Sequence, residues 1–71
     1  MAESVYAVSE LIGTSTESWE KAAAAAVEQA SRTLRDLRVA EVVKLDMTIE
    51  DGRVSSYRAR VNVSFKHEGS K

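Results

Sequence analysis

Two segments of alternating apolar and polar residues, 38–50 and 53–67, constrain the fold of this chain more than any other feature. They flank Glu50-Asp51-Gly52, a sequence typical of the turn in a β-hairpin. Because successive side chains of a strand point to opposite faces, the two segments predict antiparallel strands with one shared apolar face. The residues of that face are Val39, Val43, Leu45, Met47 and Ile49 in the first segment and Tyr57, Ala59, Val61, Val63 and Phe65 in the second.

The numbering of these apolar residues also predicts the length of the turn. All ten are odd-numbered, so the numbers of facing residues should add to an even number. A two-residue loop would give odd sums, and we therefore expect a three-residue loop with Gly52 in a left-handed conformation. The polar face then brings Asp46 opposite or diagonal to Arg58. That face is either a solvated surface or a binding surface that becomes crowded once chains assemble.

The residues before the hairpin predict one further strand and one long helix. Segment 4–13 is rich in β-branched and aromatic residues and ends at Gly13, which indicates a strand. Ser15 as N-cap, or Thr14 with Glu17 as a capping box, would begin a helix running from about 16 to 36. The predicted fold class is α+β, a β-α-β-β protomer in which a three-stranded antiparallel sheet wraps on one long helix, as a single domain over 1–71.

Small residues dominate the apolar stripe of the predicted helix. High helix propensity alone explains them, or else the helix is approached closely from more than one side, as subunit packing would require. Trp19 lies on this stripe, where a core or interface position is favoured over stacking on a ligand. The stripe consists of Trp19, Ala22, Ala23, Ala26, Val27, Ala30, Leu34 and Leu37.

Chain length and strand length both favour self-association. A 71-residue chain buries only about 60% of its unfolded surface, so its stability is marginal. Cysteine is absent, which excludes disulfides, and His67 is the only histidine. Thirteen strand residues span about 43 Å, whereas a 21-residue helix covers about 31 Å. The hairpin therefore extends beyond its helix, and a second chain can cover the remainder.

Charge and motif content disfavour several classes of function. The net charge of −1 and pI near 5.8 argue against a nucleic-acid partner. No apolar run approaches the roughly 20 residues that span a bilayer, and residues 1–13 lack the basic segment of a signal peptide. We therefore expect a cytoplasmic protein with no membrane partner. No catalytic serine–histidine–acid set, phosphate loop or HExxH motif is present, so we expect no enzymatic activity.

Several short motifs together resemble the dodecin family over nearly the whole chain. They are "IGTS" entering the helix, the alanine-rich helix itself, "AEV" in the second strand, and the closing strand with Tyr57-Arg58 and "VSF". The resemblance implies a β-α-β-β protomer and a hollow assembly of twelve subunits. Many family members hold a flavin such as FMN or riboflavin, and the role usually inferred is storage or buffering without turnover.

The positions equivalent to the family's flavin pocket are Val39, Asp46 and Arg58. Flavin-binding dodecins carry tryptophan where Val39 stands and glutamine where Arg58 stands. Lys44 replaces an acid that helps some members hold a metal, and Asp46 replaces an arginine. The missing aromatic platform contributes about 0.5–1.5 kcal/mol per stacked pair beyond area burial. The resemblance therefore predicts weak flavin binding.

The chain is most similar to the tryptophan-lacking dodecins, which share "SWE" at the helix start and "VSFK" at the end; one such type binds calcium. Hard cations require several oxygen ligands, and an assembly can supply them from different chains. The candidate calcium ligands are Glu41, Asp46, Glu50 and Asp51. We expect a non-enzymatic protein that binds or stores a small ligand or ion, calcium first, in a homododecamer. The alternatives are flavin storage and a structural assembly module without a ligand.

Overall fold

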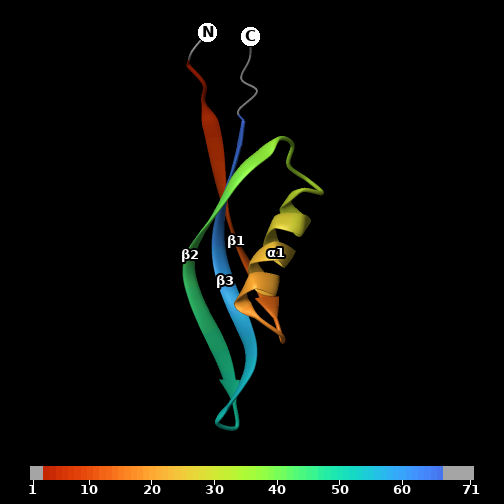
Figure 1. Cartoon of the computed structure of the whole chain (residues 1–71), viewed down its shortest axis with the longest axis vertical. Helices are drawn as coiled ribbons and strands as arrows, with labels where there is room; N and C mark the ends of the chain where they lie inside the picture. The colour runs from red at the N-terminus through yellow and green to blue at the C-terminus, as the bar shows by residue number, and fades with distance from the viewer. Residues whose placement is uncertain (1–2, 67–71) are drawn as a thin grey trace.

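A computed structural model describes residues 3–66, which form one helix and one three-stranded sheet (Figure 1). The elements are β1 (Tyr6–Ser15), α1 (Trp19–Ala30), β2 (Leu37–Glu50) and β3 (Arg53–Lys66). This order and the antiparallel pairing confirm the predicted α+β fold class. The strand order is β1-β3-β2, so the last strand lies in the middle. His67 lies outside the described residues.

Helix α1 covers only part of one face of the sheet. Figure 1 shows α1 beside the middle of the sheet and the β2–β3 hairpin extending well beyond it. The 12-residue helix is about 18 Å long, whereas the 14 residues of β2 and of β3 each span about 46 Å. The predicted mismatch between hairpin and helix is confirmed and is larger than expected. Within residues 3–66, no helix has the length and apolar character needed to cross a membrane.

The helix begins later than the predicted position 16. Strand β1 continues to Ser15, whose Oγ accepts hydrogen bonds from the backbone N–H groups of Glu17 (2.9 Å) and Ser18 (3.4 Å). The N-cap is Ser18, since its Oγ accepts from the backbone N–H of Lys21 at 3.0 Å. Serine forms such local bonds in place of helical ones. The predicted cap at Ser15 is therefore wrong by three residues.

The helix also ends earlier than the predicted position 36. The hydroxyl groups of Ser31 and Thr33 donate to the carbonyls of Glu28 and Ala30. Asp36 then adopts a φ of 58°, which directs the chain into β2. Serine and threonine compete with helical hydrogen bonding in this way, so residues 31–36 form the connection to the strand.

The hairpin loop has two residues, not the predicted three. Glu50 pairs with Arg53, and both loop residues have positive φ, 53° at Asp51 and 76° at Gly52. This pattern matches a type I′ turn, whose twist suits a hairpin. A β-bulge at Ser55 adds one residue to β3, so even sums return at Thr48↔Ser56. The numbers of facing residues therefore add to an even number from this pair as far as Lys44↔Arg60, as predicted for Asp46 and Arg58. The cause is the bulge and not a three-residue loop.

Two further irregularities in β2 change which of its residues face the helix. Arg38 and Val43 are skipped in the pairing, so Val42 lies opposite Val61 and Val39 lies opposite Ser64. An extra residue reverses the alternation of a strand, and directly opposite residues share a face. Val39 therefore lies on the polar face, and its predicted place on the apolar face is wrong.

The core is small and built from short side chains. Its buried members are Ala22, Ala26 and Ala30 of α1 and Ala59, Val61 and Val63 of β3. At Gly13 of β1, an added Cβ would lie 2.0 Å from the carbonyl oxygen of Ala22. Small residues therefore allow α1 to lie almost against the sheet. Ala24 and Ala25 are exposed, so within one chain the helix is approached from one side.

Candidate functional site

The sheet face opposite α1, called here the open face, carries most of the polar side chains. Residues that are paired across strands share a face, which defines its membership. Its residues are Ser56, Arg58, Arg60, Asn62 and Ser64 of β3, Thr48, Asp46, Lys44, Glu41 and Val39 of β2, and Thr14, Ile12, Glu10 and Val8 of β1.

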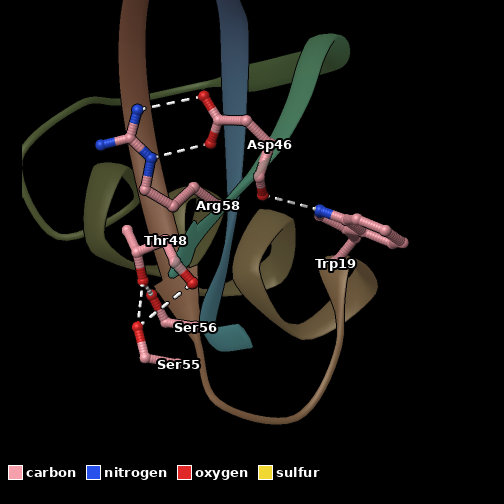
Figure 2. Close-up of polar contacts among 6 residues, drawn as sticks. All are labelled: Trp19, Asp46, Thr48, Ser55, Ser56 and Arg58. Carbon is pink, nitrogen blue, oxygen red and sulfur yellow. Dashed lines mark hydrogen bonds and ion pairs between the residues drawn. The ribbon is translucent and has the colours of Figure 1, made fainter. Parts of the chain in front are cut away.

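A bidentate ion pair joins Asp46 and Arg58 on the open face, as Figure 2 shows. Arg58 Nε donates to Asp46 Oδ1 at 2.8 Å, and a terminal guanidinium N–H donates to Oδ2 at 3.0 Å. The two residues are directly opposite in the sheet, which confirms the predicted juxtaposition. Two parallel charge-assisted bonds fix the orientation of both groups.

The charges around this pair stabilise its ionised form. The hydrogen bonds from Arg58 lower the pKa of Asp46, opposed by desolvation; the charges of Arg58, Lys44 and Arg60 lower it further. In turn, the hydrogen bonds to Asp46 and its charge raise the pKa of Arg58. The carboxylate is thus charged at neutral pH and already occupied by an internal cation.

Trp19 lies on the helix side of the sheet. Its indole Nε1–H donates to the backbone carbonyl of Asp46 at 3.0 Å (Figure 2). Its ring meets Tyr57 edge to face, with centroids 5.0 Å apart and planes at 68°. It also lines a hollow of about 460 Å³ with Glu20, Ala23, Val42 and Leu45. This position agrees with the expected core or interface role.

A cluster of three hydroxyl groups lies at the bulge and was not predicted from the sequence. The Thr48 hydroxyl lies 2.5 Å from that of Ser55 and 2.7 Å from that of Ser56 (Figure 2). Ser55 also donates to the backbone carbonyl of Thr48 at 3.2 Å. The adjacent serines opposite a threonine were the available signal, since a bulge places two residues against one. The cluster fixes the bulge that sets the register of the hairpin.

The three flavin-pocket positions do not meet within one chain. Asp46 and Arg58 are paired, whereas Val39 lies seven residues along β2, about 23 Å away. Val39 is 62% exposed, and the Ser64 hydroxyl donates to its backbone carbonyl at 3.4 Å. A hollow of about 210 Å³ lies beside it, also lined by Val27 and Leu37. A pocket that uses all three positions requires more than one chain.

The four candidate calcium ligands are likewise spread along β2. Glu41 lies opposite Asn62, Asp46 is bound to Arg58, and Glu50 and Asp51 lie at the hairpin tip. No group of three or more potential metal ligands comes together within residues 3–66 of one chain. Since calcium takes six to eight oxygen ligands, these acids do not form a complete site in one chain.

The helix side of β2 is largely uncovered, because α1 packs mainly on β1 and β3. Leu45 is 50% exposed and Ile49 is 66% exposed. Contiguous apolar surface of this kind marks an interaction site. We call it the uncovered side of β2; its residues are Val42, Leu45, Met47 and Ile49, with Val54 of β3 beside them.

Comparison with known proteins gives two curated relatives and one family model. The dodecin family model matches residues 5–68. The calcium dodecin of Mycobacterium tuberculosis is 48% identical over 63 residues, which are 89% of each chain. The dodecin of Thermus thermophilus is 41% identical over 64 residues, 90% of this chain and 93% of the relative.

Solved structures agree with these relatives. The dodecin of Streptomyces coelicolor superposes with a TM-score of 0.90 at 37% identity, over 99% of this chain and 100% of the other. The calcium dodecin of Mycobacterium tuberculosis, described as calcium-chelating with a novel calcium-binding site, superposes with a TM-score of 0.81. It is 46% identical in that comparison, which covers 96% of this chain and 97% of the other.

Proposed function

Because this chain belongs to the dodecin family, we propose that it is a non-enzymatic binding or storage protein that assembles into a hollow homododecamer. Its ligand is a small molecule or ion, with calcium as the first candidate. The expected location in the cytoplasm remains a prediction.

The uncovered side of β2 is the observation that carries the proposed assembly. Its apolar residues lie on an edge strand that projects beyond α1, so both side chains and backbone groups are available to another chain. Edge strands and exposed apolar patches are normally protected in stable proteins. A second copy of the chain protects both at once.

Calcium is proposed because of the similarity to a calcium dodecin and because of the replaced flavin positions. Within residues 3–66, neither Glu41, Glu50 nor Asp51 takes part in an ion pair. Asp46 would have to release Arg58 before it could bind a metal. A calcium site therefore has to combine carboxylates of neighbouring chains, with Glu50 and Asp51 as the local pair.

The assembly is tested by native mass spectrometry and light scattering at low micromolar concentration. The wild-type protein should give a species of twelve 7.8-kDa chains. Leu45→Glu places a charge on the uncovered side and should give smaller species that retain β-sheet circular dichroism. Val8→Glu, an equally polar change on the open face, should leave the number of chains unchanged. A wild-type monomer or dimer would refute the proposal.

The ligand is tested by thermal melts in calcium, magnesium and EDTA. A ligand that binds only the folded state raises its stability by RT ln(1 + [L]/Kd). Calcium should raise the melting temperature of the EDTA-treated protein, and the double variant Glu50→Gln with Asp51→Asn should remove the effect. If neither ion nor flavin shifts the melt, the structural module without a ligand is favoured.

The flavin alternative has its own test. The purified protein should be colourless, and Val39→Trp with Arg58→Gln should bind FMN at least tenfold more tightly than Arg58→Gln alone. Glutamine restores one hydrogen bond, about 0.5–1.5 kcal/mol, whereas tryptophan adds apolar burial at about 25 cal/mol per Å². A tenfold difference requires about 1.4 kcal/mol. Flavin fluorescence quenching measures both affinities, and equal affinities would mean that Val39 is not the missing platform.

A further inference from the structure

Two adjacent rows of the open face differ in their charges. In one row, Asp46 of β2 lies opposite Arg58 of β3, and the charges neutralise each other. In the next row, Lys44 lies opposite Arg60, so two positive charges face each other. Like charges directly opposite each other in a sheet are destabilising. The second row lacks the anion that the first row contains.

Arg60 has few internal partners within residues 3–66. Its Nε atom is buried and has no hydrogen-bond partner. The nearest carboxylate oxygen, Glu10 Oε2, lies 3.9 Å from a terminal guanidinium nitrogen, which is beyond hydrogen-bonding distance. The side chain is 40% exposed. The guanidinium group is therefore weakly held, and the side chain is partly exposed although its Nε atom is not.

We propose that Lys44 and Arg60 bind an oxyanion of the phosphate class on the open face of the sheet. A phosphate group carries about −1.5 to −2 charges at neutral pH and several acceptor oxygens, which matches two cations better than a single carboxylate does. Arginine binds such groups in a bidentate manner, and lysine acts as a point charge. Asp46 bound to Arg58 shows an oxyanion held by an arginine of this face through Nε and a terminal nitrogen. At Arg60 the buried Nε leaves the two terminal guanidinium nitrogens for such contacts.

The surrounding residues define the limits of this site. Ile12 of β1 lies on the other side of Arg60 and carries no charge. Glu10 and Glu41 flank Asn62 in the following row, so negative charge bounds the site on one side. Because Glu10 competes for Arg60, its neutralisation should strengthen the binding of an oxyanion. The positive field extends over the neighbouring row, since Lys44 and Arg60 both lower the pKa of Asp46.

The test uses the assembled, full-length protein and inorganic phosphate, with ionic strength held constant by sodium chloride. Isothermal titration calorimetry should show saturable binding to the wild type. Lys44→Gln and Arg60→Gln should each weaken it about tenfold, which corresponds to about 1.4 kcal/mol. Glu10→Gln should tighten it. Arg53→Gln removes the same charge from the hairpin end of β3 and should leave the affinity unchanged.

Three results would overturn the proposal. They are absence of saturable phosphate binding, equal weakening by Arg53→Gln, and acetate affinity equal to that for phosphate. Melting curves and native masses of each variant establish that it is folded and assembled before titration. The outcome is independent of the calcium proposal, since phosphate binding at Lys44 and Arg60 requires neither Glu50 nor Asp51.

Discussion

Strands β1 and β2 are both hydrogen-bonded to β3, but only one of them is covered by the helix. On the β1 side, Gly13 lies directly under Ala22, and the residues in contact are mostly small. On the β2 side, larger residues such as Leu45 and Met47 are exposed. We call β1, β3 and the helix packed on them the covered half, and β2 with its exposed apolar residues the uncovered half. The covered half has a buried core within one chain, whereas the uncovered half leaves apolar side chains in contact with solvent.

This difference separates folding from assembly. Close packing of small residues tolerates no added volume, so changes in the covered half should unfold the chain. Changes on the uncovered side of β2 remove exposed surface and should act mainly on association.

The largest effect is expected for Gly13→Ala. The added Cβ would meet the carbonyl oxygen of Ala22 at 2.0 Å and the Cβ of Ala26 at 3.1 Å, so α1 must move away from the sheet. Overpacking of this kind destabilises by about 1–3 kcal/mol or more, and we expect about 3 kcal/mol. Urea unfolding at a fixed protein concentration measures it.

Gly52→Ala is the matched control for that substitution. No atom lies within 4 Å of an added Cβ there, and only the positive φ of 76° opposes alanine. The cost should be about 1 kcal/mol. If the two variants were equally stable, close approach of α1 to β1 would not be what limits position 13.

The next largest effect separates the two halves directly. Val61 is fully buried in the covered half, so Val61→Ala should cost about 2 kcal/mol of unfolding free energy. Leu45 is 50% exposed, so Leu45→Ala should change the unfolding of a dissociated chain little but weaken assembly. Unfolding curves and sedimentation velocity of both variants measure the two effects. A reversed pattern would place the subunit contact on the covered half.

The sequence predicted the element order and the pairing of β2 with β3, because these depend on alternation and a turn signal. It did not predict that β1 pairs with β3. It did not predict the bulges at Arg38, Val43 and Ser55, because alternation does not mark where one residue is skipped. The bulge at Ser55 offsets the two-residue loop, so that Asp46 still faces Arg58. The bulges in β2 place Val39 on the open face.

The helix ends were predicted less well than its existence. The apolar stripe continues beyond residue 30 with Leu34 and Leu37, but serine and threonine hydroxyls form local bonds that end the helix. In the candidate site, the expectation that the numbers of facing residues add to an even number predicted the contact of Asp46 with Arg58. The contrast between that row and Lys44 opposite Arg60 required the actual register, as did the separation of Val39 from Arg58.

A smaller effect is expected for Trp19→Phe, which changes a contact between the two halves. Phenylalanine preserves an aromatic ring beside Tyr57 but removes the Nε1–H bond to the Asp46 carbonyl. The loss should be about 1 kcal/mol, measured by urea unfolding. Trp19→Leu removes the ring contact too and should cost more. If Trp19→Phe dissociated the assembly without changing the stability of the chain, Trp19 would belong to the subunit contact.

The smallest effect concerns the exposed ion pair on the open face, and it depends on pH. The ordinary pKa of an aspartate is 3.8, and the Arg58 hydrogen bonds lower that of Asp46 in the folded state. A carboxyl group with a lowered folded-state pKa stabilises the fold above its unfolded pKa, and that contribution is lost as the pH falls through the folded value.

The Asp46→Asn variant has no carboxyl group to ionise, so it lacks this contribution at every pH. The difference in melting temperature between wild type and Asp46→Asn should be small, since exposed pairs contribute little. It should be constant from pH 7 to about 5 and should close below pH 3.8. A difference that persisted unchanged to pH 2 would show that charge on Asp46 does not stabilise the fold, and that the amide acts through the shape of the contact alone.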